Sequence, residues 1–325
     1  MSASAPGGRA RLLKLAPWGL AILVLALVGR QAMTLDWAEV WAALRAQSTA
    51  TLGLALLLAA LSHGLYASFD LVSRRMLRHG LTAWRTAVTA ATSYAFNLNF
   101  GALLGGMALR LRMYTRQGVD AAIAGQVIAW SLVTNWLGYF LVGGIVLGLA
   151  PPPVPEEWPL TRDALRVAGL AIGALGVAYL VACGVSRRRE LRWREHRLAL
   201  PRARIALLQA ALSSANWLLI GTLVWMLLGR RVEFATTVAV LQLAAVAGVV
   251  THVPAGLGVL EAVFLATLGS RLPQTQLLAA LLAYRATYYL APLAWAVPAY
   301  FLGEGRGRAL VQVPLRTCGR SSSRP

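Results

Sequence analysis

Apolar stretches alternate with short polar loops along nearly the whole chain. Their positions are 15–29, 50–70, 86–109, 121–149, 165–185, 205–228, 235–251, 257–270 and 276–302. Several reach about twenty residues, the length at which an α-helix crosses the hydrocarbon core of a bilayer. The pattern predicts an all-α polytopic membrane protein. No clear cleavage site follows the run 15–29, so we interpret it as the first span and not as a signal peptide.

The charges in the loops indicate which stretches cross the bilayer. The loops rich in arginine are 70–85, 110–120 and 187–204. The Pro-rich loop 151–164 is net negative. Short basic loops remain in the cytoplasm. With a cytoplasmic amino terminus, segment 86–109 must therefore enter and leave on one side, and segment 235–271 must do the same from the other side. If each segment crossed once, two basic loops would lie outside, against the charge rule.

These constraints predict six full spans plus two re-entrant helical hairpins in an inverted repeat. A shift of about 155 residues places the apolar stretches of the first membrane repeat, 1–150, on those of the second, 165–302. Each repeat has three spans and one hairpin, and an odd number of spans turns the second repeat upside down, as in many transporters. Residues 303–325 form a basic tail that we expect to be disordered and cytoplasmic. Low identity between the halves leaves a chance alignment of apolar stretches as the alternative.

Composition supports this class and narrows the partners. The 325 residues are 58% hydrophobic and 13% charged, with a mean hydropathy of +0.61, whereas soluble domains contain about 25% charged residues. The net charge of +19 falls mostly in short loops, which indicates contact with the anionic inner leaflet and no binding of nucleic acid. The two cysteines and four histidines lack ligand spacing, so we expect no disulfide, no metal site and no cofactor.

A first polar motif lies where the first hairpin must turn. Asn97 and Asn99 would be costly in a membrane segment unless they were paired or wet, and we expect them to satisfy backbone groups at the turn. Three glycines permit a tight turn and close packing there, namely Gly101, Gly105 and Gly106.

Basic residues follow this motif directly. Arg110 and Arg112 are able to hold a lipid phosphate, because the arginine fork binds phosphate through two hydrogen bonds. The alternative is that they are ordinary cytoplasmic anchors, an interpretation that we favour for Arg112 more than for Arg110. Asp70 pairs either with Arg74 at the end of its helix or with Arg110 at the cytoplasmic mouth, and the sequence does not decide between them.

A second motif interrupts the long apolar stretch after residue 235. Pro254, Gly256 and Gly258 break the helix, which is tolerated at membrane depth only where the backbone is buried in protein or lines a cavity. Glu261 is the one acidic residue of this stretch. A buried membrane carboxylate usually marks function, although pairing with an arginine for structural reasons is the alternative and both roles are compatible.

A third motif supplies that arginine. Arg285 is the one charged residue between 272 and 303, so it is the natural partner for Glu261 or a second phosphate ligand. Tyr288 lies three residues further along, and we include it among the substrate-binding candidates, although these tyrosines also fit an interfacial belt. For Asn135 and Asn216 we expect hydrogen bonds between helices.

These motifs resemble those of the transmembrane flippase domain of the lysylphosphatidylglycerol synthase/flippase family and its stand-alone YbhN-like members. The three matching patterns are Ser-Tyr…Asn…Gly…Arg-x-Arg-x-Tyr…Gly, then Pro-x-Gly-x-Gly…Glu, then Arg…Tyr-Tyr…Pro-Leu, within roughly residues 10–302. The resemblance implies a lipid-translocating core with two re-entrant elements that handles anionic or aminoacylated phospholipid. By motif match it implies that Arg110, Glu261 and Arg285 contact the headgroup.

Three functional hypotheses follow. The first is a phospholipid flippase of the bacterial inner membrane, a multi-pass protein with both termini in the cytoplasm. The second is an intramembrane enzyme. Glu261 with His252 is the best available catalytic pair for it, and this pair alone is weak evidence for catalysis. The third is a non-catalytic partner that recruits a lipid-modifying synthase through the basic loop 187–204. We favour the first and expect no enzymatic activity, because longer family members carry an aminoacyl-transfer domain after the membrane part and this chain has only 23 residues after its last span. The sequence leaves the oligomeric state undetermined.

Overall fold

The computed structural model describes residues 37–101, 106–156, 158, 160–186, 190–193, 196–199, 201–251 and 253–311. The predicted first span 15–29, Gly105, His252 and residues 312–325 of the predicted tail lie outside this part of the chain. The elements are α2 (Trp37–Arg45), α3 (Thr49–Leu77), α4 (Ala83–Phe100), α5 (Leu109–Arg116), α6 (Ala121–Leu149), α7 (Arg162–Val185), β1 (Glu190–Trp193), β2 (His196–Ala199), α8 (Ala203–Leu227), α9 (Phe234–Thr251), η2 (Pro254–Gly256), α10 (Val259–Leu268), α11 (Gln274–Tyr284), η3 (Arg285–Leu290) and α12 (Ala291–Val311).

The prediction of an all-α membrane protein is confirmed, with a small addition. Strands β1 and β2 form an antiparallel pair within the basic loop 187–204. Among the described residues, six helices are long and apolar enough to cross a bilayer, at Thr49–Leu77, Ala121–Leu149, Arg162–Val185, Ala203–Leu227, Phe234–Thr251 and Gln274–Gly303. This set differs from the six predicted spans, because 15–29 is not described and α9, predicted as a hairpin limb, is 18 residues long.

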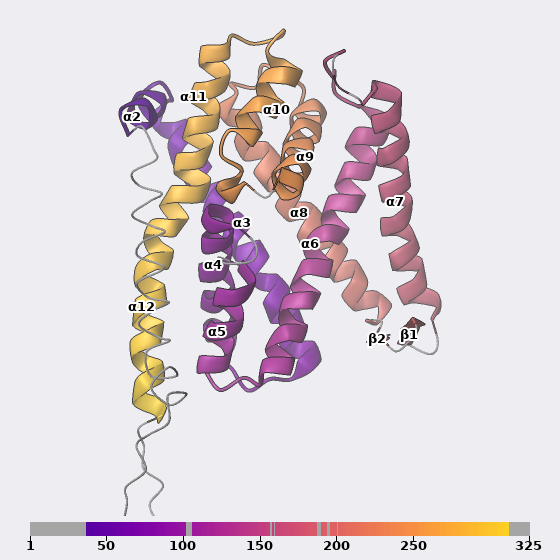
Figure 1. The fold of residues 1–325 in the computed structure, drawn as a ribbon, viewed down its shortest axis with the longest axis vertical. Coiled ribbons are helices and arrows are strands. Elements are labelled where there is room, and N and C mark those ends of the chain that lie inside the picture. The colour runs from indigo at the N-terminus through magenta and orange to yellow at the C-terminus, as the bar shows by residue number, and fades with distance from the viewer. Residues whose placement is uncertain are drawn as a thin grey trace, which may run out of the picture.

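Two pairs of helices double back inside the bundle. From the lower end in Figure 1, α4 rises to the middle and α5 returns to the lower end; from the upper end, α9 descends and α10 returns upward. The two pairs meet where α4 contacts the short turn η2. That these pairs enter a bilayer from opposite faces remains a prediction.

The sequence predicted the position of the helix break in the second pair correctly and that in the first pair only approximately. The second break lies as predicted, since α9 ends at Thr251 and α10 begins at Val259. The first prediction was wrong in detail: α4 continues through Phe100 and ends at Gly101, so Asn97 and Asn99 lie in the last helical turn and not beyond it. Asn99 Nδ2 donates to the Ala95 carbonyl oxygen at 2.8 Å, which satisfies this nitrogen within the continuing helix, whereas Asn99 Oδ1 is buried without a hydrogen-bond partner among the described residues.

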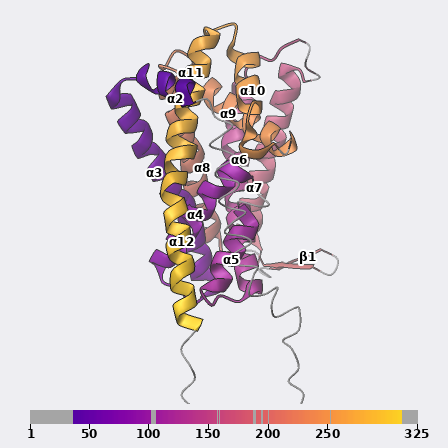
Figure 2. The ribbon, with the colours of Figure 1, turned by 60° about the vertical axis from the view of Figure 1, so that its left-hand side comes forward.

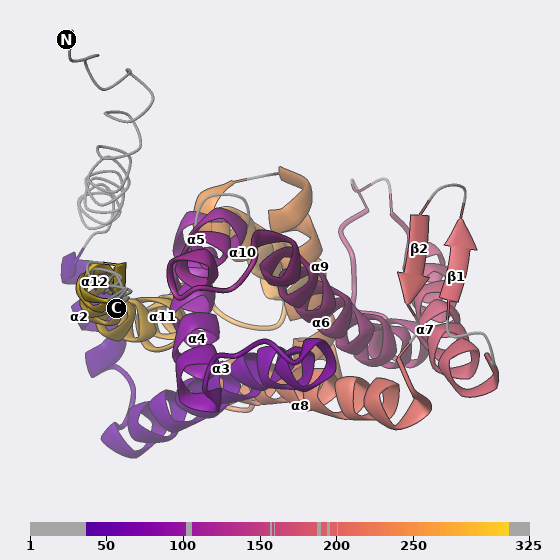
Figure 3. The same cartoon turned by 90° about the horizontal axis from the view of Figure 1, so that it is seen from below.

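The order of helices follows the predicted shift between the halves. A shift of 155 residues carries the starts of α3, α4 and α6 to positions 204, 238 and 276, and the matching helices begin at Ala203, Phe234 and Gln274. Corresponding helices run in opposite directions in Figure 1, and α3 lies beside α8 when the molecule is seen from below in Figure 3. The inverted repeat itself remains a prediction.

The basic segments gather at one end of the molecule. The turns after α3 and α5, the β1–β2 pair and the last residues of α12 all lie at the lower end in Figure 1, and Figure 2 shows β1 projecting sideways there. The acidic loop between α6 and α7 lies at the upper end. This separation is the arrangement that the positive-inside rule requires of a membrane protein.

Glycines allow α6 and α7 to pack closely. A Cβ atom on Gly144 would lie 2.4 Å from Gly173 Cα, and one on Gly169 would lie 2.6 Å from the Gly148 backbone nitrogen. Small residues at such interfaces let helix backbones approach in membranes, where packing replaces the hydrophobic effect between helices. The outer face of α7 is apolar and exposed, as Val167 and Leu175 show at 66% and 61%, which suits contact with lipid.

Candidate functional site

A buried ion pair joins α3 to α5. Arg110 Nε donates to Asp70 Oδ2 at 3.0 Å, and Arg110 Nη2 donates to Asp70 Oδ1. The Tyr114 hydroxyl donates to the same carboxylate, and Arg110 Nη2 also donates to Ser131 Oγ on α6 at 3.0 Å. Both charged side chains are at most 4% exposed. Of the two partners open to Asp70 in the sequence, the structure selects Arg110 and not Arg74.

A second ion pair, in which Arg285 is buried and the Glu261 side chain is 17% exposed, closes the break between α9 and α10. Arg285 Nε and Nη2 donate to the two oxygens of Glu261 at 2.6 and 3.0 Å, which confirms the predicted pairing. The same guanidinium donates from Nη1 to the Ala255 carbonyl oxygen and from Nη2 to the Gly256 carbonyl oxygen, both at 3.0 Å. Backbone carbonyls freed by a helix break must find partners at membrane depth. Arg285 therefore holds the turn together as well as neutralising Glu261.

The chain around Arg285 departs from regular α-helix. Residues Arg285–Leu290 form a π-helical turn between α11 and α12. Such turns insert an extra residue and are frequent at functional sites. Tyr288 and Tyr289 lie within this turn and face the interior of the bundle with Arg285, whose guanidinium carbon lies 5.5 Å from the Tyr289 ring centre.

Hydroxyl groups connect the two halves of the molecule. The Ser62 hydroxyl donates to Asn216 Oδ1 at 2.6 Å, the Ser62 and Tyr288 hydroxyls are 2.8 Å apart, and the Tyr288 and Tyr94 hydroxyls are 2.8 Å apart. Because Ser62 has a single hydroxyl hydrogen and gives it to Asn216, Tyr288 must donate to Ser62, and Tyr94 to Tyr288. The chain crosses α4, η3, α3 and α8, and it confirms the interhelical hydrogen bond predicted for the Asn216 side chain. For Asn135, only the backbone oxygen accepts such a bond, from Trp217 Nε1 at 3.3 Å.

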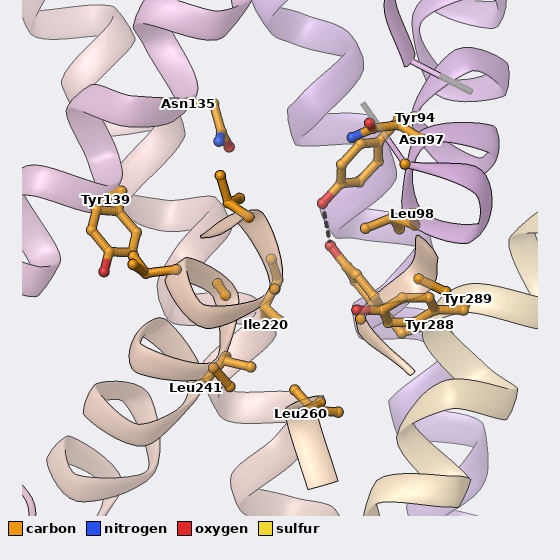
Figure 4. A pocket seen from close by; sticks show the side chains of 18 of the residues that line it. Tyr94, Asn97, Leu98, Asn135, Tyr139, Ile220, Leu241, Leu260, Tyr288 and Tyr289 are labelled. Atoms are coloured by element: carbon orange, nitrogen blue, oxygen red, sulfur yellow. Dashed lines mark hydrogen bonds between the residues drawn. The ribbon is translucent and has the colours of Figure 1, made fainter. Parts of the chain in front are cut away.

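A cavity of about 670 Å³ lies between the two helix pairs. Figure 4 shows Asn135 and Tyr139 on one wall, Tyr94, Asn97 and Tyr288 on the facing wall, and aliphatic side chains at one end, labelled Ile220, Leu241 and Leu260. Ligand pockets have volumes of roughly 300–1,000 Å³ and mostly apolar walls with a few polar groups. The cavity has both properties.

The predicted site residues divide into two groups. Asn97, Tyr288, Gly101 and Gly256 line the cavity. Those that do not line it are Asp70, Asn99, Arg110, Arg112, Glu261 and Arg285. Asn99 is buried and its Nδ2 also donates to the Tyr289 carbonyl oxygen at 3.2 Å. That Arg110, Arg112 and Arg285 hold a lipid phosphate remains a prediction.

The glycines at the two helix breaks allow backbone angles or close contacts that other residues would not. Gly101, Gly256 and Gly258 have φ angles of +84°, +56° and +77°, a region that L side chains rarely adopt. Gly106 is needed for space, because a Cβ atom there would lie 2.7 Å from Asn97 Oδ1. With Pro254 at the start of η2, these residues shape the turns as predicted for a helix break.

The sequence did not single out several residues that build the site. Ser62, Tyr94 and Tyr139 contribute to the hydroxyl chain or to the cavity wall. Tyr94 lies in the Ser-Tyr part of the first motif, so the sequence motif could have identified it as a site residue. Ser62 and Tyr139 occur in apolar stretches without any pattern that marks them.

Comparison with known proteins decides the family. A family model described as "Lysylphosphatidylglycerol synthase TM region" matches residues 15–296. The chain belongs to this family. Two curated proteins are also similar to the chain in sequence. It is 36% identical over 298 residues to "Inner membrane protein YbhN" of Escherichia coli K12, covering 91% of this chain and 94% of that protein. It is 30% identical over 262 residues to an uncharacterized protein of Synechocystis, covering 79% and 80% of the two chains.

Family membership confirms the resemblance drawn from the three motifs. Together with the six apolar helices, it identifies a multi-pass inner membrane protein related to the membrane part of a lipid synthase and flippase. The family model covers the described cavity and both buried ion pairs, so the site belongs to the region that the relatives share.

Proposed function

We propose that the protein is a lipid flippase of the inner membrane, with both termini in the cytoplasm. The cavity between the two helix pairs would hold a lipid headgroup while the acyl chains remain in the bilayer. The family name favours a phospholipid with an anionic or aminoacylated headgroup as the cargo.

The observation that carries the proposal is a cavity of ligand size whose edge faces the exterior of the helix bundle. Among the residues that line it, Val249 is 57% exposed, and Trp136 and Val253 are each 36% exposed. Apolar side chains exposed on a membrane helix face lipid, so a lipid has a lateral way in. A cavity for a soluble ligand would open instead at a polar end of the bundle.

The contacts around the cavity support movement of one half against the other. Each buried ion pair lies within a single half, Asp70–Arg110 in the first and Glu261–Arg285 in the second. The hydrogen bonds that cross between the halves near the cavity join neutral groups, such as Tyr94 and Tyr288. Alternating exposure by rocking of repeats is the usual mechanism of inverted-repeat transporters.

Filling the cavity tests the proposal. Ala245 lines the cavity, and Ala262 on α10 is exposed and does not line it. In vesicles reconstituted with the full chain, we expect Ala245→Trp to abolish the protein-dependent change in headgroup accessibility of a labelled phospholipid. Ala262→Trp places the same side chain toward lipid and should retain activity.

The assay is run with and without a proton gradient, since no energy source is assumed. Lipid movement by the unsubstituted protein that equals that of protein-free vesicles in both conditions would refute the proposal. The intramembrane-enzyme alternative has weaker support, because both oxygens of Glu261 accept hydrogen bonds from Arg285, a state unsuited to a general base. Recruitment of a synthase remains an alternative, and no feature of the described residues supports it specifically.

A further inference from the structure

The electrostatic character of the cavity is the starting point. Among the described residues that line it, no side chain is charged. Arg110 and Arg285 lie behind the wall, and each is bonded to a carboxylate, so both pairs are neutral. Residues 102–105 and 252 lie outside the described residues, and of these only His252 has an ionisable side chain.

The polar groups in the cavity are amides and hydroxyls. Asn97 and Asn135 reach into it from opposite sides, as Figure 4 shows, and neither side chain has a hydrogen-bond partner within the described chain. Each carboxamide offers two donors and two acceptor sites. Leaving such a group unpaired in an apolar cavity is costly, so a ligand that both donates and accepts hydrogen bonds would fit between them.

Aromatic side chains provide the remaining recognition surface. Trp136, Tyr139 and Trp217 form one cluster in the wall, with ring centres 5.4 Å apart for Trp136–Tyr139 and for Tyr139–Trp217. A sugar ring has apolar C–H faces that pack on aromatic rings and hydroxyls at its edge that bond to amides. Aromatic walls with a few placed polar groups are the usual chemistry for such amphipathic ligands.

We propose that the cavity takes an uncharged, hydroxyl-rich lipid headgroup, of the kind that a glycolipid carries. The sugar would lie between Asn97 and Asn135, and its glycerol and first acyl carbons against Ile220, Leu241 and Leu260. This inference rests on the proposed flippase function, and it replaces the charged phospholipid that the family name favours as cargo with an uncharged lipid. A charged headgroup is disfavoured because an ion that leaves water for an apolar cavity without a partner loses far more solvation than hydroxyls do.

A comparison of lipids in one assay tests the inference. The full chain is reconstituted in vesicles that contain, at equal mole fraction, labelled monoglucosyl diacylglycerol, phosphatidylglycerol, lysylphosphatidylglycerol or phosphatidylethanolamine. We expect the glucolipid to move and to be retained on the purified protein in native mass spectrometry at least about tenfold better than the others. Asn97→Leu and Asn135→Leu should each reduce glucolipid retention about tenfold, the effect of losing a well-formed hydrogen-bonding group.

A matched pair of tryptophans provides the control. Trp136→Leu should reduce glucolipid retention, whereas Trp295→Leu, on α12 and 48% exposed outside the cavity, should not. Equal or better movement of a phosphatidyl lipid by the unsubstituted protein would overturn the inference and leave the flippase function standing. No protein-dependent movement of any of the four lipids would overturn both.

Discussion

At the scale of single residues, the buried side chains of Asp70, Arg110 and Arg285 each take part in an ion pair. Asp70 and Arg110 are buried at 0% and 3% exposure, and the pair is completed by hydrogen bonds from Tyr114 and to Ser131. Removing one member of a buried pair leaves an uncompensated charge, whereas removing both leaves none. Removal of one member of such a pair is therefore expected to destabilise the protein more than removal of both members.

Substitution of Asp70 tests this point. We expect Asp70→Leu to lower the free energy of unfolding by about 3–5 kcal/mol, because it leaves Arg110 buried without a counter-ion. The measurement is unfolding of purified protein in detergent as a function of denaturant. The double variant Asp70→Leu/Arg110→Met should regain much of the loss. Asp163→Leu, in an exposed pair with Arg166 on α7, is the control and should change stability by less than about 1 kcal/mol.

Some of these contacts between individual residues could be predicted from the sequence. It identified Glu261 and Arg285 as partners because each is the one charge in its apolar stretch, and it left Asp70 with two possible partners. It did not find the hydroxyl chain through Ser62 and Tyr94, since a serine or tyrosine in an apolar stretch has no pattern that reveals its partner. The cavity lining likewise depends on the distances between helices, which a sequence alone does not give.

At the scale of elements, helix breaks and helix contacts determine the architecture. The break at Pro254–Gly256 was predictable from proline and glycine, whereas the end of α4 was placed too early because Asn97 and Asn99 were taken as turn residues. An asparagine near a helix end bonds equally well to the carbonyl oxygen one turn earlier, as Asn99 does. Local composition therefore located both breaks to within a few residues and did not fix the exact ends of the helices.

The packing of α6 on α7 gives a prediction at this scale. We expect Gly144→Val to destabilise the protein by about 1–3 kcal/mol, because the new side chain would collide with the backbone of Gly173. Gly184→Val on α7 is the matched control, since a Cβ atom there would meet no atom within 4 Å. Thermal unfolding in the same detergent compares the two variants. Equal midpoints would show that the close approach of these helices is not needed for stability.

At the scale of the whole molecule, charge is separated between the two ends of the helix bundle. The basic turns and the β1–β2 pair lie at one end of the bundle, and the acidic loop after α6 lies at the other. The sequence predicted this separation from loop charge alone, because the rule that places basic loops in the cytoplasm does not depend on how helices pack. Which helices meet around the cavity depended on tertiary contacts and was not predicted.

Cysteine labelling tests the orientation. In a variant without Cys183 and Cys318, we expect a cysteine in place of Arg78 to react with an impermeant maleimide only after the cells are opened. A cysteine in place of Glu156 should react in intact cells, because we expect the acidic loop to face the periplasm. The reverse pattern would contradict the assigned orientation, and reaction of both positions in intact cells would contradict the separation of the two ends.

The placement of the two ion pairs has a consequence for how the protein is made. Asp70 meets Arg110 only 40 residues later in the chain, and Glu261 meets Arg285 only 24 residues later. The ribosome therefore delivers each counter-ion soon after the charge that needs it, and both members of the first pair are synthesised before the second half begins. For these two pairs, insertion into the membrane does not have to wait for a distant segment to neutralise the buried charge.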